Sequence, residues 1–167
     1  YEVAGYSLIS KTKRFNALVF GGEKATVTKG RQKVLVHNNI RMIPVLEDMS
    51  HLFLVNEALD NNEIVSMPAD RVIGSAKSIT HELLGAEVRF PAGPISVATL
   101  KEQDVLAVNV MKVSAKCYKV YVKRLSYDKQ ASRKEQMQQL TDSYVKELER
   151  KVRQYPLQWF NFYDFWT

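Results

Sequence analysis

Two short stretches of the sequence combine residue types that could bind a polar or anionic group. In the first, Asp70 and Arg71 come just after IVSMP (residues 64–68), a run typical of a strand closed by proline. The loops at the carboxyl ends of strands form the ligand crevice of an α/β sheet. The Asp–Arg pair could therefore bind a head group there, or it could be a local salt bridge that orders the loop.

The second stretch is Phe90-Pro91-Ala92-Gly93-Pro94. Its two prolines fix the backbone, and Gly93 allows another group to approach closely. The spacing predicts a helix within residues 91–103 whose first residue is Pro94. The free amides of that helix would point back at the loop and favour an anion or oxyanion. The stretch could equally be a rigid corner between a strand and a helix.

Other catalytic or metal-binding patterns are absent from the sequence. His37, His51 and His81 do not have metal-ligand spacing, and we expect structural or surface roles for them. There is no nucleophile elbow, P-loop or dinucleotide fingerprint. The single cysteine, Cys117, excludes an internal disulfide and suits a reducing compartment. We therefore expect neither a metal nor a cofactor.

The net charge of +6 is concentrated in residues 112–134, which alone carry +7. Such a local field attracts an acidic partner, which could be a phosphorylated lipid, an anionic membrane surface, an acidic carrier protein or nucleic acid. A solvated strand face would explain the same charges. The chain has no recognition-helix motif and lacks the aromatic-and-glycine pattern of single-strand binders, so we expect no nucleic-acid partner.

Strand-like and helical patterns alternate along the chain. This alternation predicts an α/β fold with a mainly parallel sheet, flanking helices and an antiparallel edge strand. Residues 78–90 are expected to be extended or irregular. The predicted strands are 16–20, 40–46, 64–68, a central strand over 104–113 and the antiparallel 117–125, and the predicted helices lie within 23–38, 47–63 and 91–103.

A long helix followed by an aromatic tail is predicted over residues 131–167. Ser132 and Glu135 form a capping box, and Pro156 ends the helix. The rings after it could pack back on the helix or anchor the chain at a membrane interface. The tail has no basic residue beside its rings, which favours packing. The apolar stripe of the helix consists of Met137, Leu140, Tyr144, Leu148, Val152 and Tyr155.

Several of these segments together resemble one family, the lipid A biosynthesis (lauroyl/myristoyl) acyltransferases, particularly versions from Bacteroides-like bacteria. The resemblance implies that residues 1–167 are a single, incomplete acyltransferase domain, the C-terminal portion of a longer chain whose N-terminal part is missing. It is carried by DMSHLFLVNEALDNNEIVSMPADR (48–71), which ends in ADR (69–71), by FPAGPISVA (90–98) and by YVKELERKVRQYPLQWFNFYDFW (144–166).

The resemblance also implies a catalytic dyad and a binding site. The family uses an H-x4-D/E motif, in which a histidine base takes a proton from the acceptor and the acidic residue orients the histidine. Tyr1-Glu2 matches the end of this motif, so Glu2 would be the acidic member and the histidine would precede Tyr1. Asp70 and Arg71 would line the cleft, with Arg71 on a phosphate. Phe90, Gly93 and Pro94 would border the site for the acyl chain and head group.

The partners that the resemblance implies are an acyl donor, a lipid acceptor and a membrane surface. The donor would be a thioester of acyl carrier protein or acyl-CoA, and the acceptor a lipid A precursor or similar lipid. The protein would work at the cytoplasmic face of the inner membrane, either peripherally or anchored by a missing N-terminal segment. The alternative from another class is a catalytically inactive module that binds lipid or carrier protein.

The position of the histidine generates a first prediction. A carboxylate without the base that it orients cannot carry out general-base chemistry. The 167-residue chain should therefore turn over an acyl thioester far more slowly than a longer polypeptide that includes the upstream histidine. Thioester consumption by the two proteins measures this difference, and equal rates would contradict the assignment of Glu2.

Overall fold

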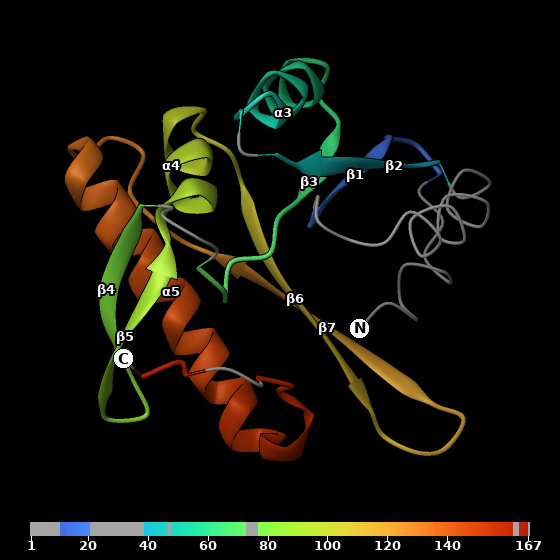
Figure 1. The fold of residues 1–167 in the computed structure, drawn as a ribbon, viewed down its shortest axis with the longest axis vertical. Helices are drawn as coiled ribbons and strands as arrows, with labels where there is room; N and C mark the ends of the chain where they lie inside the picture. Colours follow the sequence, from blue (N-terminus) through green and yellow to red (C-terminus); the bar gives the residue numbers. More distant parts are fainter. Residues whose placement is uncertain (1–10, 21–38, 47, 73–76, 162–163, 167) are drawn as a thin grey trace. The chain divides into compact units, whose positions relative to one another are not determined.

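The computed structural model describes residues 11–20, 39–46, 48–72, 77–161 and 164–166 (Figure 1). The chain divides into two compact units, Tyr1–Pro68 and Ala69–Thr167, each of which has its own internal contacts. The structure is mixed α/β, with one parallel and two antiparallel sheets among the described residues. Glu2 and the helix predicted within residues 23–38 lie outside the described residues.

The first unit contains a parallel sheet. Strand β1 (Phe15–Phe20) lies between β2 (Ile40–Val45) and β3 (Ile64–Ser66) and is parallel to both. These strands confirm the three predicted from apolar runs. The Asn16 side chain, fully buried in β1, donates to Glu63 Oε2 at 2.9 Å and to the Ile64 carbonyl at 3.1 Å, which holds β1 to β3.

The helix predicted within residues 47–63 is α3 (His51–Asp60), and its start is fixed by side chains. The Ser50 amide donates to Asp48 Oδ1 at 3.0 Å, and the Leu46 amide donates to Nδ1 of the buried His51 at 3.4 Å. The His51 ring thus satisfies a backbone amide of the connection between β2 and α3. His51 is thus a structural histidine, as predicted.

In the second unit, residues 78–91 form a hairpin where the sequence indicated an extended or irregular segment. Strands β4 (Ser78–Leu83) and β5 (Ala86–Pro91) are antiparallel, and Leu83 pairs with Ala86 across a two-residue turn. Leu84 and Gly85 both have positive φ, 57° and 87°. Such a turn normally uses Asn-Gly or Asp-Gly, and leucine is rare at positive φ, so the sequence did not indicate it.

Helix α4 (Ala92–Leu100) begins two residues before Pro94, so the predicted start is wrong. Pro91 is the N-cap, with an extended backbone at φ −65° and ψ 126°. The first turn of a helix has amides without intrahelical partners, and Pro94 is tolerated inside it because its missing N–H is not needed there. The helix therefore starts directly at the end of β5.

Strands β6 (Val105–Lys112) and β7 (Tyr118–Leu125) form an antiparallel ribbon. The antiparallel direction of the second strand was predicted. The prediction of a central strand over residues 104–113 differs from the structure, because among the described strands β6 pairs only with β7. The apolar residues on both faces of β6 suggested a fully covered strand, but only the face with Ala107 and Met111 is buried.

Helix α5 (Arg133–Gln154) organises the second unit, and its predicted capping box is confirmed. The Ser132 side chain accepts from the Glu135 amide, while the Glu135 carboxylate accepts from the Ser132 amide at 3.0 Å. The Ser132 hydroxyl, which donates to Glu135 Oε2 at 2.6 Å, and the Ser132 amide hold the pKa of the Glu135 carboxyl below its usual value. A short 3-10 helix, η2 (Pro156–Gln158), follows α5.

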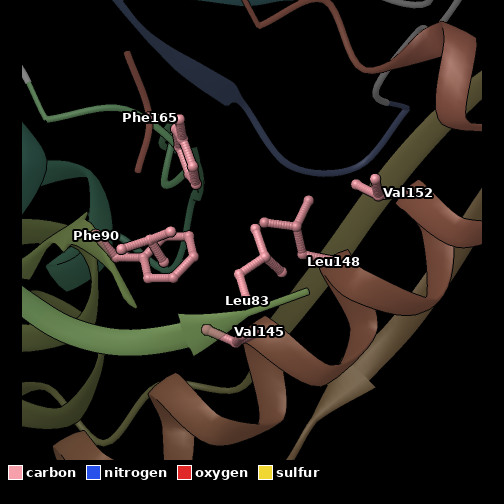
Figure 2. Close-up of a cluster of buried hydrophobic side chains, with 7 residues drawn as sticks. Leu83, Phe90, Val145, Leu148, Val152 and Phe165 are labelled. Carbon is pink, nitrogen blue, oxygen red and sulfur yellow. The ribbon is translucent and has the colours of Figure 1, made fainter. Parts of the chain in front are cut away.

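The main core of this unit joins the β4–β5 hairpin, α5 and the aromatic tail (Figure 2). Phe165 is 4% exposed, and its ring meets those of Phe90 and Trp159 edge to face at centroid distances of 5.9 and 4.9 Å. The Trp166 indole donates to the Leu83 carbonyl at 3.2 Å. The buried members of this core are Leu83, Val88, Phe90, Val145, Leu148, Val152 and Phe165.

The tail gives a second prediction. Phe165→Ala should lower the free energy of unfolding by about 3–5 kcal/mol, because it removes a buried ring and leaves a cavity. Leu157→Ala, in the same tail at a side chain that is 90% exposed, should change it by less than about 0.5 kcal/mol. Urea unfolding of both variants measures the difference. If the free energy of unfolding fell by a similar, small amount in both variants, the tail would not be part of the core.

Candidate functional site

The Phe90–Pro94 corner lies where β5 passes into α4. The Phe90 side chain is buried at 1% exposure, and its ring contacts those of Tyr144 on α5 and Phe165 in the tail at centroid distances of 5.8 and 5.9 Å. The ring points into the core, as Figure 2 shows. Phe90 therefore anchors the corner to the core, and its expected place at the border of the substrate site stays a prediction.

The first turn of α4 offers few free amides. The Ala92 amide donates to the Lys77 carbonyl at 2.9 Å, and Pro94 has no amide hydrogen. Pro91 provides no side-chain cap. Gly93 is exposed, and a Cβ added to it would meet no atom within 4 Å. In this turn, Gly93 is thus the exposed residue whose amide could donate to an oxyanion or anion, so the predicted site has fewer backbone donors than a whole helix start.

Asp70 and Arg71 lie in the connection between β3 and β4, as expected for a loop after a strand of the parallel sheet. Asp70 is half-buried and Arg71 is exposed. Each takes part in an interaction within the chain. Their proposed roles at the cleft stay predictions, as does that of Glu2, which lies outside the described residues.

His81 joins the β4–β5 hairpin to α5. Its Nε2 lies 2.9 Å from Asp142 Oδ1, and its Nδ1 lies 2.9 Å from the Glu82 carbonyl. Both ring nitrogens therefore have partners, which agrees with the structural role predicted for this histidine. Asp142 also accepts from the Gln138 side chain at 2.7 Å. The pair holds β4 to α5.

A buried lysine on α5 is a feature that sequence reasoning missed. Lys151 is 1% exposed, and its ammonium nitrogen lies 3.2 Å from the centroid of the Tyr121 ring on β7. Burial lowers the pKa of Lys151. The Tyr121 and Tyr155 hydroxyls share a 2.5 Å hydrogen bond, which raises the pKa of Tyr155. The signal available in the sequence was the four-residue spacing of Lys151 from Tyr155, which places the two on one face of a helix.

Two further properties of the described residues bear on function. They contain no group of three or more His, Cys, Asp or Glu side chains placed to hold a metal ion. Their helices include none that combines the length and the apolar character needed to cross a bilayer.

Comparison with known proteins identifies the enzyme class and the family to which the chain belongs. The match is to enzymes that transfer acyl groups: the model of the bacterial lipid A biosynthesis acyltransferase family covers residues 24–167. The chain belongs to that family. The matched region includes the Asp70-Arg71 loop, the Phe90–Pro94 corner, α5 and the aromatic tail. A search among curated proteins gave no significant match.

The corner gives a third prediction. Gly93→Ala should fold as well as the wild type, since the new methyl group meets no atom within 4 Å and alanine favours a helix. Gly93→Leu should also fold but should slow acyl transfer by roughly tenfold or more, because its side chain would fill the space that the acyl chain or head group needs. Melting temperature and turnover are measured together, in a polypeptide that includes the upstream histidine. Normal turnover by Gly93→Leu would show that substrate does not approach this corner.

Proposed function

We propose that the protein transfers a fatty acyl chain from an acyl thioester to a lipid acceptor such as a lipid A precursor. The observation that carries this proposal is the family match over residues 24–167, which makes the chain part of an acyltransferase. The match favours the enzyme over a non-catalytic module that binds lipid or carrier protein. The donor in this proposal is acyl carrier protein or acyl-CoA.

The chemistry is a displacement at a thioester carbonyl. A histidine, expected upstream of Tyr1 and oriented by Glu2, takes the proton of the acceptor hydroxyl or amine. The oxygen or nitrogen bonds to the carbonyl carbon, the C–S bond breaks, and the thiol leaves with a proton. The tetrahedral intermediate carries a negative oxygen, which the exposed Gly93 amide suits as a hydrogen-bond donor.

Charge supports the choice of reactants. Acyl carrier proteins, coenzyme A and phosphorylated lipids are all anionic, and the basic stretch at residues 112–134 would attract them. Within the proposal, the exposed Arg71 holds a phosphate of the acceptor or of the carrier arm. As part of the same proposal, the protein works at the cytoplasmic face of the inner membrane.

The direct experiment uses a polypeptide that contains this chain together with the upstream histidine. It is incubated with an acyl carrier protein thioester and an under-acylated lipid A precursor, and the lipid is analysed by mass spectrometry. The proposal predicts a product heavier by one acyl chain. Thioester loss without acylated lipid, or no thioester loss, would overturn it.

Arg71→Ala in the same assay tests the site. The variant should lower kcat/KM by roughly tenfold or more with an unchanged melting temperature, because a charge-assisted hydrogen bond to phosphate is lost. Arg153→Ala is the matched control: it removes an exposed arginine whose partner is Glu149 at 2.7 Å on α5, and it should leave kcat/KM unchanged. A lowered melting temperature with normal kinetics for Arg71→Ala would make Arg71 a structural residue.

A further inference from the structure

The side chain of Lys151 is buried without a charged partner. Its ammonium nitrogen lies 3.2 Å from the centroid of the Tyr121 ring and 3.3 Å from Gln154 Oε1, and the residue is 1% exposed. None of the ion pairs formed by the described residues includes Lys151. A buried ammonium without an opposite charge is rare, because leaving water costs free energy that a counter-ion and hydrogen bonds normally recover.

The acidic residue that favours the charge of Lys151 is already bound to another cation. Glu147, one turn earlier on α5, accepts from Arg150 Nε at 2.8 Å and from Arg150 Nη2 at 2.7 Å. This paired contact neutralises the carboxylate. Arg150, and also Lys119 on β7, oppose the charge of Lys151. The ammonium therefore lies beside two other cations and a carboxylate that is engaged elsewhere.

The side chains that surround Lys151 belong to the second unit. Tyr121 comes from β7, Gln154 from the last turn of α5, and Tyr155 is the residue that ends this helix. The Tyr121 and Tyr155 hydroxyls share a hydrogen bond of 2.5 Å, and the centroids of the two rings lie 6.0 Å apart. The ribbon and the C-terminal end of α5 thus build this environment together.

The Tyr121 ring offsets part of the cost of burying the ammonium. The face of an aromatic ring attracts a cation, but this attraction is weaker than the hydration that a fully buried ammonium loses. The uncharged amine is therefore favoured more strongly than it is in water. In agreement, burial, reinforced by the charge of Arg150, lowers the pKa of Lys151.

Lys151 lies where the ribbon is attached to the end of α5. Besides the tyrosine pair, Gln158 of η2 accepts from the Lys112 amide at 2.8 Å and donates to the Lys112 carbonyl at 2.9 Å. These bonds and the Lys151–Tyr121 contact hold the two strands of the ribbon to the end of the helix. The charge of Lys151 therefore acts directly on this junction.

We propose that Lys151 makes the junction responsive to pH: the ribbon is held to α5 more firmly when Lys151 is an uncharged amine than when it is an ammonium. The inference goes beyond the proposed function and does not rest on it. It is tested without turnover, so that its failure and the failure of the acyltransferase assignment are distinguishable.

The expected pH dependence has a definite sign. Because the pKa of Lys151 is lower in the folded protein than in the unfolded chain, stability should rise with pH until the ordinary lysine value of 10.5. The hydrogen bond from Tyr121 raises the pKa of Tyr155, whose contribution is present below the ordinary tyrosine value of 10.0 and is lost above it. The contribution of Lys151 should therefore be gained between neutral pH and about pH 10.

Nuclear magnetic resonance measures the charge of Lys151 in the unchanged sequence. The chain is labelled with carbon-13, and the lysine Cε signals, which move when an ammonium loses its proton, are followed from about pH 7 to about pH 10.5. The Lys151 signal is assigned through its correlations with the backbone. The proposal predicts that this signal moves at lower pH than the signals of the other lysines. Titration of Lys151 together with the other lysines would overturn it.

The effect on the junction is measured with Lys151→Met, which removes the charge and keeps a long, unbranched side chain. At about pH 7 this variant should raise the melting temperature of the second unit by about 2 °C or more. The gain should shrink toward about pH 9.5, where the wild-type lysine has itself lost part of its charge. Both tryptophans of the chain, Trp159 and Trp166, lie in the second unit, so tryptophan fluorescence follows its unfolding.

Lys146→Met is the matched control, since it removes an exposed lysine one turn earlier on the same helix. It should leave both the melting temperature and its pH dependence close to those of the wild type. An equal gain for Lys151→Met at the two pH values would overturn the proposal, because the lysine would then keep its charge throughout. A lower melting temperature for Lys151→Met at both pH values would also overturn it, because the ammonium would then hold the ribbon better than an uncharged side chain.

Discussion

The edge-to-face contacts of Phe90 with Tyr144 and Phe165 are the interaction on which the second unit depends. Each ring comes from a different element: the end of β5, the middle of α5 and the tail. Such pairs contribute about 0.5–1.5 kcal/mol beyond the burial of their area. Phe90 is followed immediately by Pro91 and the first turn of α4, so fixing this ring fixes the direction in which the corner and the Gly93 amide face.

Helix α5 links the corner to the ribbon because it is buried on more than one side. Val145 and Leu148 face the hairpin and tail, Leu140 lies in the cluster with β6, β7 and α4, and Lys151 lies against Tyr121 of β7. Gln158, just beyond the helix, accepts from the Lys112 amide at 2.8 Å and donates to the Lys112 carbonyl at 2.9 Å. The candidate active-site corner and the β6–β7 ribbon are thus both held by one helix.

Features set by local sequence were predictable, and those set by tertiary contacts were not. The Ser132–Glu135 capping box and the strands of the parallel sheet follow from residue types and spacing, and the structure has them. The turn at Leu84 was missed because its positive φ is maintained by packing against the hairpin core rather than by turn residues. The burial of the Phe90 ring was not predictable either, because a ring beside a Pro-Gly loop looks the same in sequence whether it points inward or outward.

The most direct test of the central claim is amide hydrogen exchange at the corner in the wild type and in Phe165→Leu. If the aromatic contacts hold the corner, the Ala92 amide, bonded to the Lys77 carbonyl, should lose protection in the variant. The Asn109 amide, at a hydrogen-bonded position of the β6–β7 ladder, should lose much less. Unchanged protection at Ala92, or an equal loss at Ala92 and Asn109, would contradict the claim that Phe165 positions the corner through Phe90.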